Sequence, residues 1–247
     1  MRYLVLTDIH GNLEALDACL ADAAARRCDR TLVLGDIVGY GADPNLVVER
    51  VRALGPAGLV RGNHDKVCCG LESPDGFNAI ARAAALWTQA ALTPGNRDWV
   101  AALPRGPLAI DDALEICHGS PSDEDEYIFG SSEARHALFR SSRPVCLFGH
   151  THYPAVFYGA HGQLEGSRIG NPGEMIVPLL PGMRYLINPG SVGQPRDGDA
   201  RAAYGIVDTT AATVELWRVE YAVELAQQKI RDAGLPAALA DRLGVGR

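Results

Sequence analysis

The chain has 247 residues, of which 47% are hydrophobic and 21% are charged, and its formal net charge is −7. This length suits one large domain, and the composition is that of a soluble protein with a sizeable core. The acidic balance supplies no basic field for nucleic acid, which is therefore disfavoured as a bulk partner. The six cysteines form no C-x-x-C pair, which favours free thiols over a disulfide framework.

The N-terminal stretch MRYLVLTDIHG has too few apolar residues before Asp8 to form the core of a signal peptide. No segment approaches the length of a membrane span, so we expect no membrane partner. The sequence therefore predicts a cytoplasmic protein.

Short apolar runs alternate with longer helical patterns in the first third of the chain. Asn12 is a plausible N-cap for the first helix, and Pro44 is typical of the first position of the second. We expect strands at 2–7, 30–36 and 57–63 and helices at 12–27 and 44–54. This β-α-β-α-β order predicts parallel neighbouring strands with right-handed crossovers.

After the first third of the chain, the alternation of strands and helices gives way to a helical segment and then to strand pairs. Residues 76–103 are rich in alanine and predict a helical insert, and from residue 107 strand pairs begin around a tight Asp111-Asp112 turn. Further helices are expected near 132–140 and in a tail at 222–243 that breaks at 234–236. Further strands are expected at 144–150, 155–158, 163–168, 184–188, 203–208 and 213–220.

So many strands favour two sheets packed face to face with helices outside. We therefore predict a mixed α/β fold, namely a four-layer αββα sandwich of two mixed β-sheets, over a single doubly wound sheet. No internal repeat or low-complexity linker interrupts the sequence, so we expect one domain over residues 1–247.

Side chains that can bind metal follow five of the expected strands, each beside a glycine. In α/β sheets ligand sites form at the carboxyl ends of strands, so these groups could converge on one crevice. They are Asp8 and His10, then Asp36, then Asn63 with His64 and Asp65, then His118, and finally His150 with His152.

Each of these motifs alone has an ordinary structural explanation. Asp8 could cap the following helix and Asp36 could start a turn, and we read His136 and His161, outside the pattern, as hydrogen-bonded core residues. The joint pattern favours function, because five of the seven histidines fall at strand ends. Mixed oxygen and imidazole donors in this number suit two divalent cations that share one carboxylate, drawn from Mn, Fe, Co, Ni or Zn.

In this order the motifs resemble those of the calcineurin-like metallophosphoesterases: D-x-H, G-D, G-N-H-D, a lone H and G-H-x-H, over roughly residues 1–220. The resemblance implies two divalent ions, with manganese favoured and Asp36 bridging. One ion would take Asp8, His10, Asp36 and His152, and the other Asp36, Asn63, His118 and His150. A hydroxide shared by the ions would be the nucleophile. His64 would be the general acid, oriented by Asp65.

The segments LGDIVGYGADPN, HGSP and INPGSVGQPRDGD are similar to those of the small prokaryotic phosphodiesterase branch, which includes diadenosine-tetraphosphatase-like relatives. Gly39 and Tyr40 depart from the protein-phosphatase branch, which has an acid and a phosphate-clamping arginine at these two places. The resemblance therefore argues against a protein phosphatase.

We expect a dinuclear metal-dependent phosphodiesterase or phosphatase that acts on a small phosphorylated or nucleotide substrate. A dinucleoside polyphosphate hydrolase and a nuclease are the alternatives, and the acidic balance disfavours the nuclease. A non-enzymatic scaffold on the same fold would be expected to have lost His64 or some ligands, and all are present. The sequence leaves open whether the protein forms a homo-oligomer.

Three further features have two interpretations each. Asn188 to Ser191 could form a second loop near the phosphate, with Arg196 reaching in, or simply a tight turn. Tyr40 could stack on an aromatic leaving group or pack at the surface. The acidic run 123–126 is read as a solvated loop rather than a third metal site.

Overall fold

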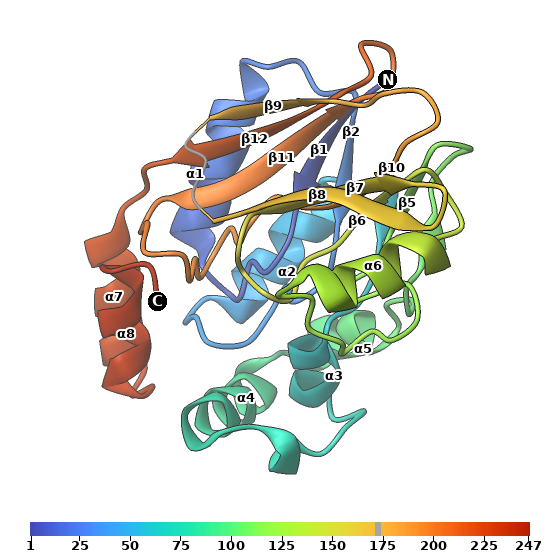
Figure 1. Ribbon diagram of the computed structural model, residues 1–247. Helices are drawn as coiled ribbons and strands as arrows, with labels where there is room; N and C mark the ends of the chain where they lie inside the picture. The colour runs from blue at the N-terminus through green and yellow to red at the C-terminus, as the bar shows by residue number, and fades with distance from the viewer. Residues whose placement is uncertain (171–173) are drawn as a thin grey trace.

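The computed structural model describes residues 1–170 and 174–247, and it consists of two stacked sheets with helices outside them (Figure 1). The predicted αββα sandwich is confirmed. The described strands are β1 Arg2–Leu6, β2 Arg30–Val33, β3 Gly58–Leu59, β4 Leu108–Ala109, β5 Leu114–Ile116, β6 Val145–Leu147, β7 Ala155–Ala160, β8 Gln163–Ile169, β9 Met175–Pro178, β10 Arg184–Asn188, β11 Ala202–Asp208 and β12 Thr213–Val219. The described helices are α1 Leu13–Ala24, α2 Pro44–Ala53, α3 Asn63–Cys69, α4 Ala79–Ala91, α5 Pro94–Ala101, α6 Ser131–Arg140, α7 Val223–Asp232 and α8 Ala237–Leu243, with a short 3-10 helix at Pro74–Gly76.

The first sheet has the strand order β3-β2-β1-β11-β12-β9. Strands β1, β2 and β3 pair in parallel, as the β-α-β-α-β pattern predicts, while β11 and β12 add antiparallel neighbours. Helix α1 begins at the predicted N-cap, where Asn12 Oδ1 accepts a hydrogen bond from the Ala15 amide at 3.1 Å. The carboxyl ends of β1 and β2 therefore lie side by side at one edge of this sheet.

The second sheet has the order β4-β5-β6-β10-β7-β8. Its strands β5, β6 and β10 are parallel neighbours, so their carboxyl ends also meet at one edge. Helix α6 packs on the outer face through Ala134, Ala137 and Leu138, which contact Phe157 and Leu186 of the sheet.

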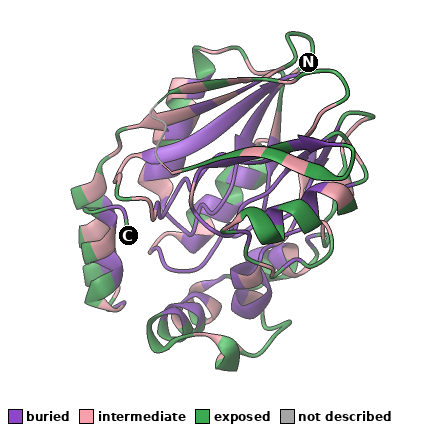
Figure 2. Ribbon diagram, viewed as in Figure 1, coloured by how far each residue is buried: buried purple, intermediate pink, exposed green. Residues whose placement is uncertain are grey.

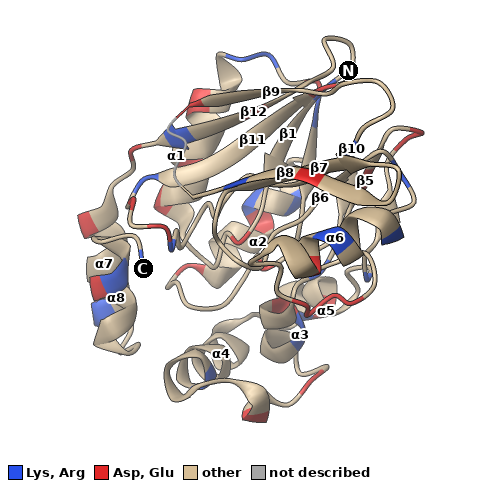
Figure 3. Cartoon of the chain, viewed as in Figure 1, with Lys and Arg blue, Asp and Glu red and all other residues tan. Residues whose placement is uncertain are grey.

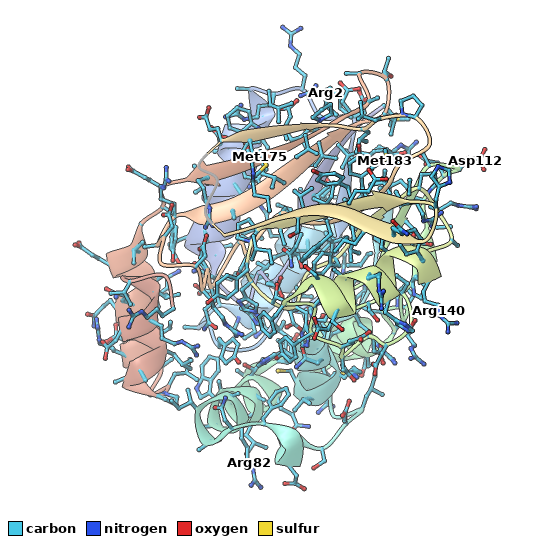
Figure 4. The ribbon with its side chains drawn as sticks, in the orientation of Figure 1. Arg2, Arg82, Asp112, Arg140, Met175 and Met183 are labelled. Atoms are coloured by element: carbon cyan, nitrogen blue, oxygen red, sulfur yellow. The ribbon has the colours of Figure 1, made fainter. Side chains whose placement is uncertain are left out.

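The space between the sheets is filled by apolar side chains from both. Val5 and Leu34 from the first sheet pack with Ile116 and Leu147 from the second, and all four are at most 1% exposed. Figure 2 shows these strands as buried. Met175 and Met183, labelled in Figure 4, pack against the same core from its edge.

Three sequence expectations differ from the structure. The third strand is shorter than predicted, because Asn63 and His64 already belong to helix α3 rather than to a strand end. Strand β9 was not predicted at all. His136 and His161 are exposed rather than in the core.

Acidic and basic residues are interspersed on the face of the protein seen in Figure 3. Among the helices in the described part of the chain, none is long and apolar enough to cross a membrane.

Candidate metal centre

The side chains predicted to bind metal come together from five segments of the chain. Asp8 and His10 follow β1 and Asp36 follows β2, whereas His118 follows β5 in the facing sheet. All of the proposed ligands are buried except Asn63, which is partly exposed; the rest of the set is Asp8, His10, Asp36, His118, His150 and His152. The two sheets thus close on one polar cluster at the carboxyl ends of their strands.

Ligand atoms in the cluster form two groups that share one carboxylate. Asp8, His10, Asp36 and His152 make the first group, and in each group the ligand atoms lie within 4.8 Å of one another. Asp36 Oδ2 lies 3.4 Å from His10 Nε2 in the first group and 3.4 Å from His118 Nε2 in the second. Asp36 is thus the carboxylate that the two groups share.

The second group consists of Asp36, His118 and His150. Asn63 joins it from the first turn of α3, since its Oδ1 lies 3.3 Å from His118 Nε2. Gly62 lets the start of α3 approach Asp36 closely, because a Cβ atom at residue 62 would lie only 2.1 Å from Asp36 Oδ1. The glycine beside this ligand is therefore required by the lack of space.

Ring nitrogens face each other in pairs across the cluster. His10 Nε2 lies 3.1 Å from His152 Nε2, and His118 Nε2 lies 3.1 Å from His150 Nδ1. Metal-binding histidines generally donate their other ring N–H to a carbonyl, which fixes the tautomer and aims the free lone pair at the ion.

Main-chain carbonyl oxygens provide such contacts for all four rings. His118 Nδ1 lies 2.7 Å from the Leu34 oxygen, and His152 Nδ1 lies 2.6 Å from the Gln194 oxygen. The equivalent contacts of His10 and His150 are to Val38 at 3.2 Å and Asp125 at 3.1 Å. In the His10–His152 pair both rings are neutral, so the lone pairs that face each other repel, and a cation between the rings would remove that repulsion. This donor set therefore fits divalent metal ions.

Burial and charge together keep most of the rings neutral. Burial lowers the pKa of His150 to about 3 and also lowers the pKa values of His10 and His152. His118 differs: burial opposes its protonated form, but the charge of Asp36 and a hydrogen bond to it raise the pKa to about 10. Neutral imidazole is the form that binds a metal, so burial prepares three of the four rings.

Backbone strain is concentrated at the same residues. Asp8, His10, Asp36, His150 and His152 all have φ between 50° and 68°. Residues other than glycine rarely adopt this left-handed region, and such strain persists where the surrounding structure enforces it, often at functional sites.

His64 lies beside the cluster without joining either group of ligands. Its ring centroid is 4.9 Å from that of His10, and the ring contacts Tyr40 and Phe77 at centroid distances of 4.3 Å and 4.6 Å. Its Nδ1 atom is buried without a hydrogen-bond partner. A Cβ atom on Gly39 would lie 2.7 Å from this nitrogen, so no larger residue fits there.

The carboxylate of Asp65 bonds main-chain amides, and no hydrogen bond joins it to His64 in the described part of the chain. Its Oδ1 accepts from the amides of Ile37 and Val38 at 2.9 Å and 3.1 Å, and its Oδ2 accepts from the Gly62 amide at 3.0 Å. The carboxylate instead ties the start of α3 to the loop that carries Asp36. The packing of Tyr40 and Phe77, rather than Asp65, holds the ring of His64.

The acidic run at 123–126 is not a simple solvated loop. Glu124 is 8% exposed, and its carboxylate accepts two hydrogen bonds from Arg61, at 3.0 Å and 3.1 Å. Lys66 of α3 bonds both Glu124 at 3.3 Å and Asp125 at 2.6 Å. Because the Asp125 carbonyl contacts His150, this network also positions a proposed ligand. Sequence reasoning missed it, since no local pattern marks such long-range ion pairs.

A model of the calcineurin-like phosphoesterase superfamily domain matches residues 1–212 of the chain. The uncharacterized protein MJ0912 of Methanocaldococcus jannaschii is 38% identical over 250 residues, which cover 98% of this chain and 97% of that protein. The crystal structure of a metallophosphoesterase from Sphaerobacter thermophilus is similar with a TM-score of 0.88 and 40% identity, covering 100% of this chain and 99% of that one. The hypothetical protein PH1004 from Pyrococcus horikoshii shares the fold, with a TM-score of 0.80 at 20% identity and coverage of 100% and 98%.

The fold, the buried His/Asp cluster and these matches define a metal-dependent phosphoesterase. The chain belongs to the calcineurin-like phosphoesterase superfamily.

Proposed function

We propose that the protein hydrolyses phosphodiester bonds in a small phosphorylated or nucleotide substrate, with two divalent ions held by the cluster. The observation that carries this proposal is the position of Asp36 Oδ2, which lies 3.4 Å from a ring nitrogen of each ligand group. Two ions bridged by one carboxylate would polarise a water molecule and neutralise phosphoryl charge.

The chain would hold the two ions with separate sets of side chains. Asp8, His10 and His152 would complete the first site, and Asn63, His118 and His150 the second. Mixed nitrogen and oxygen donors favour manganese and its neighbours in the first transition row, or zinc, over calcium.

His64 is proposed as the group that protonates the leaving oxygen. It is 4% exposed and lies next to the ligand Asn63, yet its nitrogens belong to neither ligand group. Burial lowers its pKa to about 4. The negative charge of a bound substrate would favour the protonated ring and raise the pKa again.

An aromatic shelf beside the second group of ligands favours a nucleotide substrate. We give this name to Tyr127 and Phe129, whose rings stack at 5.3 Å with 5° between their planes although they are 44% and 56% exposed. Tyr127 also stacks on the imidazole of His150 at 3.8 Å. Large aromatic side chains left in solvent beside a reaction centre suit stacking of a base. A dinucleoside polyphosphate is therefore the second candidate substrate.

A metal and substrate panel tests the general proposal. Protein freed of metal by a chelator would be reloaded with Mn, Ni, Co, Mg or Zn and assayed on phosphomonoesters, phosphodiesters and dinucleoside polyphosphates. His152→Ala, which removes a ligand, pairs with His136→Ala, which makes the same change at an exposed position on α6. We expect metal-dependent phosphodiester turnover that only the first variant loses. Equal activity in the two variants, or turnover in excess chelator, would contradict the proposal.

Phe129→Ala tests the shelf, with exposed Tyr158→Ala on β7 as its control. Loss of one stacking partner should raise KM for nucleoside esters by roughly 5- to 100-fold and leave simple alkyl esters unchanged, because a base stack contributes about 1–3 kcal/mol. An equal change for both kinds of ester would argue against a nucleotide substrate.

A further inference from the structure

The loop that follows β10 is fastened to the metal cluster at one end. Ser191 Oγ donates to the main-chain oxygen of Asp8 at 2.8 Å, and the Gly193 amide donates to the same oxygen at 2.9 Å. The Gln194 carbonyl oxygen lies 2.6 Å from His152 Nδ1. The segment turns at Asn188, whose Oδ1 accepts from the Gly190 amide at 2.8 Å, and it also lies beside the cluster, so both interpretations of this segment agree with its geometry.

The other end of the loop is fastened to the body of the protein. Asp197 forms a buried ion pair with Arg218 of β12, in which the two side chains are 1% and 2% exposed. The Gly198 amide donates to the Gly246 carbonyl oxygen at 2.9 Å. Arg196 lies between these two anchored ends, so the position of its backbone is fixed.

The guanidinium group of Arg196 lacks the carboxylate partner that its neighbours have. Arg201 pairs with Asp199 at 2.7 Å and Arg218 pairs with Asp197, but no ion pair of Arg196 is found within the described ranges 1–170 and 174–247. Its Nη2 donates to Gln194 Oε1 at 3.1 Å, and its Nε is buried and has no hydrogen-bond partner among the residues that the structure describes.

Tyr40 lies under this guanidinium group, with Arg196 Cζ 5.8 Å from the ring centroid. The tyrosine is 6% exposed, and its ring contacts His10 and His64 at centroid distances of 4.7 Å and 4.3 Å. It is therefore neither a surface residue nor free to stack on a base. Instead it links Arg196 to a proposed metal ligand and to the proposed acid.

The positive charge of Arg196, beside a cluster that would bind cations, would be stabilised by an anion. Arg196 adjoins the cluster on two sides: the ring of Tyr40 beneath it contacts His10 and His64, and Gln194, which accepts from its Nη2, has its carbonyl oxygen at His152. Holding one cation beside a cluster that binds others is unfavourable unless negative charge lies between them. A phosphoryl group carries that charge, and its oxygens match the planar fork of a guanidinium.

We propose that Arg196 binds a non-bridging oxygen of the substrate's phosphoryl group, with the ring of Tyr40 as its support. This inference rests on the proposed phosphoesterase function and adds a substrate-binding residue to it. Tyr40 occupies the place at which the protein-phosphatase branch has a clamping arginine, and the loop after β10 would supply a guanidinium from elsewhere in the chain.

Binding of inorganic phosphate to the metal-loaded protein tests this without relying on turnover. Isothermal titration would compare wild type with Arg196→Gln and Arg196→Lys, and Arg50→Gln would serve as the control, because Arg50 is an exposed residue of α2 that pairs with Asp17. Metal content and phosphodiester kinetics would be measured on the same samples. Because Arg196→Gln removes a hydrogen bond between two charged groups, we expect the affinity for phosphate to be roughly 10- to 100-fold weaker.

We expect a smaller loss for Arg196→Lys, since it keeps the charge but not the fork, and none for the control. All variants should keep the metal content of wild type. Unchanged phosphate affinity in Arg196→Gln would overturn the proposal, and so would loss of metal, which would make Arg196 a support of the His152 loop instead. Wild-type protein that binds phosphate through Arg196 but hydrolyses no phosphate ester would sink the proposed function alone.

Discussion

Replacing His64 with alanine tests whether this residue is a general acid, because its ring adjoins the cluster but belongs to neither group of ligands. The variant should keep both ions, since every proposed ligand remains. Its rate should fall by about 10²- to 10⁴-fold for a substrate with a poor leaving group, as is usual for a general acid. The loss corresponds to about 3–5 kcal/mol of transition-state stabilisation.

The protonation state of His64 narrows the expected fall in rate. Burial lowers its pKa to about 4, so the ring is mostly neutral at pH 7 before substrate binds. A neutral ring can still donate one N–H to the leaving oxygen, although it cannot be as strong an acid. We therefore expect a loss near the lower limit, about 10²-fold.

The assay is a plot of log rate against leaving-group pKa for wild type, His64→Ala and the exposed control His136→Ala. Activated aryl esters need no proton and should be least affected, so the line for His64→Ala should be steeper than the other two. Parallel lines together with lost metal would place His64 in the metal shell and refute the reasoning.

Three further predictions concern neighbouring residues. Asp36→Ala should remove both ions and all turnover, because its Oδ2 lies 3.4 Å from a ring in each ligand group, and retention of two ions in metal analysis would refute the bridge. Asp65→Asn should lower the free energy of unfolding by about 1–3 kcal/mol in urea titration, since an amide cannot accept from all three amides that bond Asp65; an unchanged midpoint would contradict this. Phosphodiesters should exceed phosphoserine peptides in kcat/KM by a wide margin, because Gly39 and Tyr40 replace the protein-phosphatase clamp, and equal values would overturn that interpretation.

The fold and the clustering of the candidate metal-binding side chains could be predicted from sequence because both depend on local patterns. Hydrophobic runs mark the strands, and each candidate ligand motif contains a glycine near the end of an expected strand. His118 and His150 lie far from Asp8 in sequence, but the rule that sites form at carboxyl ends of strands brings them together.

The role of Asp65 could not be predicted so easily, because it depends on where α3 begins. Once Asn63 is helical, Asp65 occupies the third helical position and turns back to the Gly62 amide, as side chains at that position commonly do. The burial of Glu124 and the place of Arg196 depend on contacts with distant segments. No local pattern marks the burial of Glu124, and for Arg196 the sequence left two interpretations open.

The central claim is that two divalent ions in this cluster drive phosphodiester hydrolysis. Its most direct test is to titrate metal-free protein with Mn²⁺ while bound metal per chain and the hydrolysis rate of a phosphodiester are recorded on the same samples. The account predicts no activity without metal, binding that saturates at two ions per chain, and full activity only when the second ion is bound. Full activity in metal-free protein, or saturation of both binding and rate at a single ion, would contradict it.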